Sequence, residues 1–324
     1  MKAETFAWTK EWTDATKQKA KALYEQEVQK LKEAQCKEVR VAILGCEASG
    51  KTVFIAAMAH QFQERGKHRF FLECGNRTAI NFLGRTWRIL ASGDWPPPTN
   101  MNQLHTAEFV LHDSQSENRH QVMVLDFAGE YYRAVFGDDE PNLEGTVSRQ
   151  LWDFACKADI TLILISLDDF IDSAPHERLE QNEFAPKKIA DLAKARGAVF
   201  AVVFSKADRF KAELQKHNNN WKTVFAAFLP ATHGAHPDAP VFAVSSVNKT
   251  IADHGREIPG PDFDSEGYDK LLEWTVDEAN KIARHRGRRL WIVKAKIALV
   301  VGVLLLMLLR MVTWEMFTSI RPAP

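Results

Sequence analysis

The feature that most constrains the fold of this chain is an eight-residue segment, GCEASGKT, at residues 45–52. It fits the pattern GxxxxGK[ST] and lies between an apolar stretch, residues 39–44, and a stretch of helix-forming residues. In such a loop the glycines let backbone N–H groups turn toward phosphates, and the N-terminus of the following helix favours the anion. We therefore predict a phosphate-binding loop that joins a strand to a helix.

The residue types of this loop suit separate tasks. Lys51 is expected to meet the β- and γ-phosphates of a nucleotide, and Thr52 to ligate Mg²⁺. Glu47 stands where small residues are common, so it could hinder catalysis or contact a partner. The predicted nucleotide-binding residues of this segment are Gly45, Cys46, Glu47, Ala48, Ser49, Gly50, Lys51, Thr52 and Val53.

From residue 39 onward, short apolar runs alternate with helical stretches, a pattern typical of a parallel sheet with helices on both faces. The runs at residues 107–111 and 121–125 predict a hairpin, which gives the sheet one antiparallel edge. The sequence therefore predicts an α/β fold with a mostly parallel sheet. The predicted strands are residues 40–44, 69–72, 107–111, 121–125, 160–165, 199–204 and 241–244, and the predicted helices are 51–65, 77–91, 144–154, 178–196, 221–228 and 268–289.

A second candidate motif, DFAGE, follows the predicted strand at residues 121–125. Asp126, at the tip of that strand, can hold Mg²⁺, commonly through a water, and Gly129 can donate its backbone N–H to a γ-phosphate. A DxxG segment alone is as often an ordinary turn. Its position after a phosphate-binding loop favours the magnesium and phosphate role.

Three prolines stiffen the loop GDWPPPT, residues 93–99, which precedes the predicted hairpin. Thr99 is the candidate hydroxyl that closes over magnesium when a γ-phosphate is present. The alternative is a rigid connector whose threonine has no such role.

The segment Ser205-Lys206-Ala207-Asp208 follows an apolar run and is similar to an [NT]KxD element. In such an element the Asp carboxylate accepts hydrogen bonds from guanine N1–H and N2–H₂, which adenine lacks, while the Lys stem lies along the ring. Ser205 replaces the usual Asn or Thr, so a surface loop is the alternative. Ser245 and Ser246 follow the last predicted strand, where backbone N–H groups could meet the guanine O6.

With these motifs in this order, the sequence resembles GTPases of the translation-factor-related (TRAFAC) class over about residues 39–285. GCEASGKTVFI, WPPPT and DFAGE are similar to bacterial double-GTPase-type families. The resemblance implies a P-loop GTPase fold, GTP and GDP as ligands, Mg²⁺ as cofactor, and an effector or a second GTPase as partner. It implies catalytic roles for Lys51, Thr99, Gly129 and Glu130, magnesium binding by Thr52, Thr99 and Asp126, and guanine recognition by Lys206 and Asp208.

Glu130 is a departure from this class, because Ras-like proteins usually have a Gln there that orients the attacking water. A carboxylate cannot donate a hydrogen bond to the γ-phosphate and brings like charge near it. We therefore expect GTP hydrolysis as a conformational switch that is slow without a partner. A nucleotide-binding scaffold that hydrolyses little, and an ATP-dependent P-loop enzyme, are the alternatives.

The overall composition argues against nucleic acid as the main partner, since Lys plus Arg equals Asp plus Glu at 42 each. The cysteines show no CxxC spacing, so neither a zinc site nor a disulfide framework is indicated. They are Cys36, Cys46, Cys74 and Cys156.

The N-terminal residues 1–38 are dense in Lys and Glu, and residues 13–36 contain neither Gly nor Pro. This composition predicts one charged helix. We expect it to pack on the globular domain, with a coiled-coil or partner contact as the alternative.

An uncharged apolar run of 13 residues lies at residues 297–309. Extended to residues 291–314, with a Trp at each end, it would reach about 36 Å as a helix, enough for the ~30 Å hydrocarbon core. Basic residues precede the run more than they follow it, which places the preceding domain in the cytoplasm. We therefore expect a single-pass membrane protein, with a buried or interfacial helix as the alternative. The resemblance to bacterial families implies that the membrane is a bacterial inner membrane. The predicted domains are a charged helix (1–38), a GTPase domain (39–289), a transmembrane helix (290–317) and a tail (318–324).

Overall fold

The computed structural model describes two units of the chain, Glu38–Lys281 and a second made of Met1–Lys37 with Ile282–Pro324, and each is taken by itself. The described residues are 39–45, 49–64, 66–98, 105–115, 119–126, 129–137, 140–166, 168, 175–260 and 263–319. Of these, only the backbone is described at residues 105, 124–126, 129–130, 175–182, 290 and 299–319.

The larger unit is built on a seven-stranded sheet in the order β2-β3-β4-β1-β5-β6-β7. Only β3 runs against the other six strands, because it pairs antiparallel with both β2 and β4 while the remaining pairs are parallel. The strands are β1 (Val41–Gly45), β2 (Phe70–Cys74), β3 (His105–Asp113), β4 (Arg119–Asp126), β5 (Ile160–Ser166), β6 (Val199–Ser205) and β7 (Val241–Ala243).

The mostly parallel α/β sheet and the β3–β4 hairpin confirm the prediction from the sequence, with one difference. The hairpin is not itself the edge, because β2 pairs with β3 on its outer side. Two apolar side chains of β2, Phe70 and Leu72, are buried there. The edge of the sheet on this side is therefore β2, which pairs with the hairpin and buries apolar side chains of its own.

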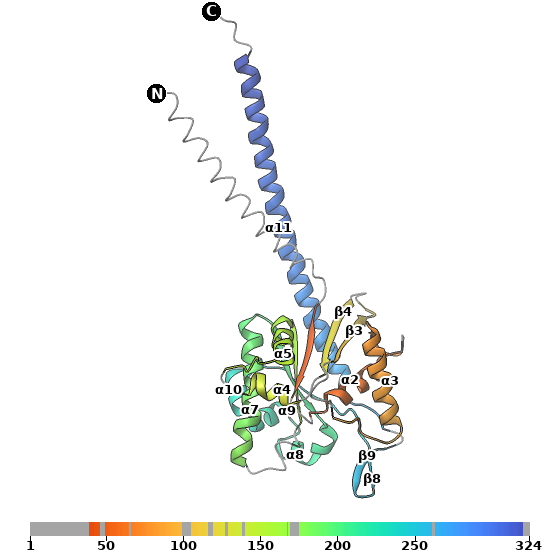
Figure 1. Cartoon of the computed structure of the whole chain (residues 1–324). Coiled ribbons are helices and arrows are strands. Elements are labelled where there is room, and N and C mark those ends of the chain that lie inside the picture. The colour runs from red at the N-terminus through yellow and green to blue at the C-terminus, as the bar shows by residue number, and fades with distance from the viewer. Residues whose placement is uncertain are drawn as a thin grey trace, which may run out of the picture. The chain divides into compact units, whose positions relative to one another are not determined.

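Helices cover both faces of this sheet (Figure 1). On one face, Ala42 and Leu44 of β1 belong to a buried cluster with residues of α4, α5 and α7. Alternate residues of a strand point to opposite faces, and on the other side Phe54 of α2 packs on Tyr268 of α11. The helices are α2 (Lys51–Gln61), α3 (Arg77–Ala91), α4 (Gly129–Phe136), α5 (Thr146–Lys157), α7 (Pro175–Ala195), α8 (Lys211–Lys216), α9 (Trp221–Phe228), α10 (Pro230–Ala235) and α11 (Tyr268–Ser319), with a 3₁₀ turn at Ala207–Phe210.

A two-stranded hairpin, β8 (Thr250–Asp253) with β9 (Arg256–Pro259), was not predicted. All four residues of β8 are exposed, so the strand has no alternation of buried and exposed positions. Its turn has positive φ angles at His254 (44°) and Gly255 (79°), as two-residue hairpin turns require.

α11 continues to Ser319, so the predicted membrane helix at residues 290–317 is part of a longer helix. Within the part of the chain that the structure describes, no helix has the length and apolar character needed to cross a membrane. The side chains from residue 299 on, and the whole of the predicted N-terminal helix at residues 1–38, lie outside that part. The domain boundaries and the membrane segment stay predictions.

Candidate functional site

The phosphate-binding loop lies where β1 ends and α2 begins. At two of its positions, steric constraints require a glycine. Gly50, before α2, has φ 77°, a left-handed conformation that glycine adopts at little cost. A Cβ on Gly45 would come within 2.6 Å of the Leu164 carbonyl oxygen on β5. Both glycines are therefore needed for the chain to take this path. Cys46, Glu47 and Ala48 lie outside the described residues.

The side chain of Lys51 extends across the phosphate-binding loop toward its first residue. Lys51 is 7% exposed, and its Nζ donates a hydrogen bond to the Gly45 carbonyl oxygen at 2.8 Å. Burial of an ammonium group is costly without polar partners, so this bond helps to hold the charge inside the loop. Thr52 follows in the first turn of α2 and is half-buried.

The Ser205 hydroxyl joins the SKAD segment to the phosphate-binding loop. Ser205 is the last residue of β6 and is buried. Its Oγ lies 2.8 Å from the carbonyl oxygen of Ser49 and 3.2 Å from that of Ile165. A serine at this position therefore links the two predicted motifs directly.

Asp208 is held by a neighbouring serine. Its backbone N–H donates to Ser245 Oγ at 2.8 Å, and the same hydroxyl donates to the Asp208 carboxylate. The backbone N–H of Ser245 itself donates to the Glu266 carbonyl oxygen at 3.0 Å. This N–H is thus already bonded within the protein, and the prediction that backbone N–H groups of Ser245 and Ser246 meet the guanine O6 stays a prediction. The Ser245 side chain orients the carboxylate.

Lys206 lies beside a carboxylate that was not predicted. Its Nζ is 2.6 Å from Oδ2 of Asp168, and the same oxygen is 2.9 Å from Nη1 of Arg209. Asp168 comes two residues after β5 ends. Ligands of open α/β sheets bind outside the carboxyl ends of the strands. That rule could have identified Asp168 as a candidate site residue from the sequence.

Residues of three separately predicted segments line one cavity of about 430 Å³. The phosphate-binding segment contributes Gly50 and Val53, the SKAD segment contributes Lys206 and Asp208, and the segment after β7 contributes Ser246. Trp95, Thr250 and Glu257 line it too and were not predicted. The predicted base-reading residues and the predicted phosphate-binding loop therefore open onto the same space.

The predicted magnesium and γ-phosphate residues are described less fully. Thr99 lies outside the described residues. β1 and β4 are parallel neighbours with Val41 beside Val122, so Asp126 ends β4 at the level at which Gly45 ends β1. Gly129 and Glu130 begin α4, with their backbone alone described. Within the described side chains, no group of three or more His, Cys, Asp or Glu could hold a metal ion.

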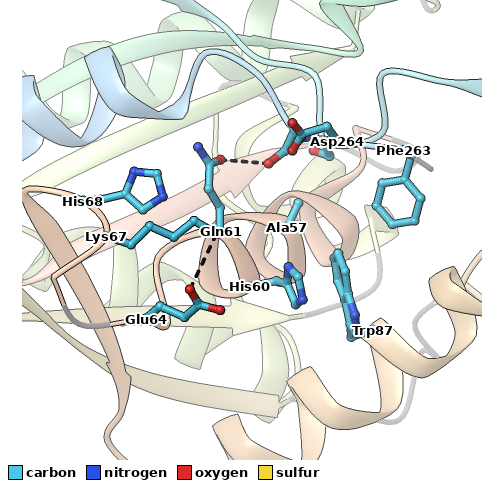
Figure 2. A pocket seen from close by; sticks show the side chains of 11 residues that line it. Ala57, His60, Gln61, Glu64, Lys67, His68, Trp87, Phe263 and Asp264 are labelled. Carbon is cyan, nitrogen blue, oxygen red and sulfur yellow. Dashed lines mark hydrogen bonds and ion pairs between the residues drawn. The ribbon is translucent and has the colours of Figure 1, made fainter.

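A smaller cavity of about 280 Å³ lies beside the C-terminal half of α2 (Figure 2). His60 stacks on Trp87 with ring centroids 3.4 Å apart, and burial lowers the pKa of His60. Ser265 donates a hydrogen bond to Gln61 at 2.8 Å. Ser246 lines both cavities.

Comparison with known proteins places most of the chain in one group. A family model described as Double-GTPase 2 matches residues 39–257, more than half of the chain. Among solved structures, the chain is similar to a *Methanosarcina barkeri* protein titled "Roco2 RocCORdC bound to GDP", at 11% identity and a TM-score of 0.33. That match covers 76% of this chain and 50% of the other, so the chain spans half the length of that relative. No curated protein matches.

Proposed function

Because this chain belongs to the Double-GTPase 2 family, we propose that it binds GTP and GDP in the 430 Å³ cavity and hydrolyses GTP as a conformational switch. One observation carries this proposal. Gly50, Asp208 and Ser246 come from three segments that were predicted separately, and they line one cavity. A cavity of this size, with a few polar groups that converge on it, is typical of a small-ligand site.

The phosphates of the nucleotide would lie at the N-terminus of α2. The backbone N–H groups of a helix N-terminus and the nearby ammonium of Lys51 favour an anion there. Mg²⁺ would be held by Thr52, Asp126 and Thr99, and when bound it neutralises charge that develops on the phosphates. The hydroxyl of Thr52, at the start of α2, is an oxygen ligand of the kind that Mg²⁺ prefers.

Guanine would be read by Asp208. Its carboxylate is oriented by the Ser245 hydroxyl, and it can accept hydrogen bonds from both N1–H and N2–H₂ of guanine. Adenine presents neither donor in that arrangement, so the carboxylate would keep only the Ser245 hydroxyl and lose both bonds from the base, which costs several kcal/mol in total. The stem of Lys206 would lie along the base.

Hydrolysis would be slow without a partner, because Glu130 stands where a glutamine would orient water. Gly129 would donate its N–H to the γ-phosphate, and GTP would order the segments of Thr99 and Glu130. A partner, either an effector or a second GTPase, would sense the difference between the two states. Glu130 also favours the second candidate function, a nucleotide-binding scaffold with little turnover.

The apolar run at residues 297–309 would anchor the protein in a membrane, with the GTPase domain in the cytoplasm. Two large apolar residues just before this run, Trp291 and Ile292, are 71% and 48% exposed. Trp is typical of the boundary between membrane and water.

Calorimetry with GDP, GTP and ATP tests the proposed function. We expect GDP and GTP to bind and ATP to compete at least a hundredfold more weakly, as two lost charge-assisted hydrogen bonds imply. Asp208→Asn should shift preference toward xanthosine nucleotides, whose base carries an acceptor where guanine carries an amino group. Equal binding of ATP and GTP by the wild type would contradict guanine recognition. A measurement of phosphate release from GTP then distinguishes the hydrolysing switch from the nucleotide-binding scaffold with little turnover.

A further inference from the structure

The loop that carries the predicted magnesium ligand Thr99 is joined to the β8–β9 hairpin. Trp95, in that loop, donates a hydrogen bond from its indole Nε1 to the backbone carbonyl oxygen of Glu257 at 2.7 Å. The loop also packs against β9 two residues earlier, where a Cβ on Gly93 would lie 3.8 Å from both Ile258 and Pro259.

Both Trp95 and Glu257 line the cavity of about 430 Å³, which we call the nucleoside cavity. Trp95 contributes to it from the loop, and Thr250 and Glu257 contribute from the hairpin. The Glu257 carboxylate also lies 3.9 Å from Arg209, whose guanidinium is bonded to Asp168 beside Lys206. The hairpin is therefore linked at its Glu257 end both to the loop of Thr99 and to the segment that carries Asp208.

We propose that the β8–β9 hairpin forms the outer wall of the nucleoside pocket and that Trp95 is a positioning residue that fixes this wall through its bond to the Glu257 carbonyl. This inference rests on the proposed function. The bond joins two segments that lie far apart in the sequence, and a nucleoside that leaves past them must separate them. Breaking the bond should therefore raise the rate of nucleotide dissociation.

The position of the wall predicts which nucleotides it affects. It lines the cavity together with the base-reading residues Lys206 and Asp208, and base and ribose are common to GDP and GTP. Its loss should therefore speed the release of both nucleotides by the same factor. A role in sensing the γ-phosphate would affect GTP alone.

Trp95→Phe isolates the bond, because it removes the indole N–H donor and keeps an aromatic ring. The full chain is loaded with tritiated GDP or with radiolabelled GTPγS, and dissociation is followed by filter binding after excess unlabelled nucleotide is added. A bond of ordinary strength corresponds to roughly a fivefold change. We expect both rates to rise by about that factor, while the melting temperature of the nucleotide-free protein falls by no more than about 2–4 °C, since one ordinary hydrogen bond is lost and Trp95 is 42% exposed.

Two further variants separate the bond from other effects. Asp253→Asn changes an exposed carboxylate of the same hairpin that does not line the cavity and leaves the bond in place, so both rates should stay at the wild-type value. Gly255→Val strains the turn of the hairpin, where φ is 79° and no atom lies near the added side chain, so it should speed both releases without touching the cavity.

The outcomes are distinct. Rates in Trp95→Phe that stay at the wild-type value, or a rise for GTPγS alone, would overturn the inference and leave the proposed function standing. A rise in Asp253→Asn equal to that in Trp95→Phe would show that the effect does not come from the bond and would overturn the inference too. A wild-type protein that binds neither nucleotide overturns the proposed function, and the inference with it.

Discussion

Asp208 is the predicted base-reading residue, and a single hydroxyl fixes its carboxylate. Ser245 accepts from the Asp208 backbone N–H and donates to its side chain. A carboxylate that is held in place loses less conformational freedom when it binds the base. The affinity for guanine nucleotides should therefore depend on the Ser245 hydroxyl through its hold on Asp208.

Ser245→Ala tests this dependence. The variant removes both hydrogen bonds to Asp208, and we expect the affinity for GDP to fall about tenfold, equal to about 1.4 kcal/mol. Isothermal titration calorimetry measures it. Ser265→Ala is the matched control, since its hydroxyl bonds to Gln61 in the smaller cavity, and it should bind GDP as the wild type does. An unchanged affinity in Ser245→Ala would show that Asp208 does not depend on this hydroxyl.

Lys51→Ala should abolish nucleotide binding. The ammonium of Lys51 is held across the phosphate-binding loop, and charge-assisted bonds to two phosphates account for at least about 3 kcal/mol, or more than a hundredfold in affinity. Lys67→Ala removes an exposed lysine that pairs with Glu64 and serves as the control. If folded Lys51→Ala protein bound GTP with wild-type affinity, the phosphate site would have to be placed elsewhere.

The sequence predicts those candidate site residues whose chemistry is tied to a local pattern, such as Gly45, Gly50 and Lys51. It did not identify Asp168 or Trp95, because each acts through a partner that is distant in the chain. It also did not indicate that the Ser245 N–H, predicted to meet the base, bonds to a residue of the same chain. The Ser245 N–H donates to the Glu266 carbonyl oxygen. No local sequence pattern indicates that residues 263–267 lie beside Ser245.

At the scale of elements, all seven strands of the main sheet were predicted to within a few residues, because each contains apolar residues in a short run or in alternation. The β8–β9 hairpin was missed, since β8 is exposed along its whole length. α4 was missed because its first two residues, Gly129 and Glu130, were interpreted as a phosphate-sensing loop. Exposed or functional segments carry little of the burial pattern on which such predictions depend.

The approach of β1 to β5 gives a prediction at this scale. In Gly45→Ala the new Cβ would lie 2.6 Å from the Leu164 carbonyl oxygen and 2.8 Å from Ser49 Oγ. One strand end or the loop must shift, and we expect a loss of about 1–3 kcal/mol in the free energy of unfolding, measured by urea denaturation. Gly84→Ala, in α3 with no atom near the added Cβ, should instead stabilise by about 0.5–1 kcal/mol. Equal effects of the two variants would contradict this steric explanation.

At the scale of the whole molecule, the candidate nucleotide site and the apolar run belong to different parts of the chain. Every described residue that lines the nucleoside cavity falls within Glu38–Lys281. The apolar run at residues 297–309 falls in the other unit. The two halves of the proposed function can therefore be separated by one cut in α11.

Truncation after Arg289 makes that cut, and it should give a soluble protein that binds GDP with the affinity of the full chain. It removes Trp291, Ile292 and the apolar run but keeps Tyr268, whose buried hydroxyl donates to the Phe54 carbonyl oxygen and bonds to Ser246. The full-length protein should sediment with membranes and resist a carbonate wash. If the truncated protein aggregates or loses nucleotide, and the full chain washes off, the apolar run belongs to the folded core. The membrane proposal would then fail while guanine recognition stands, because the two rest on separate residues.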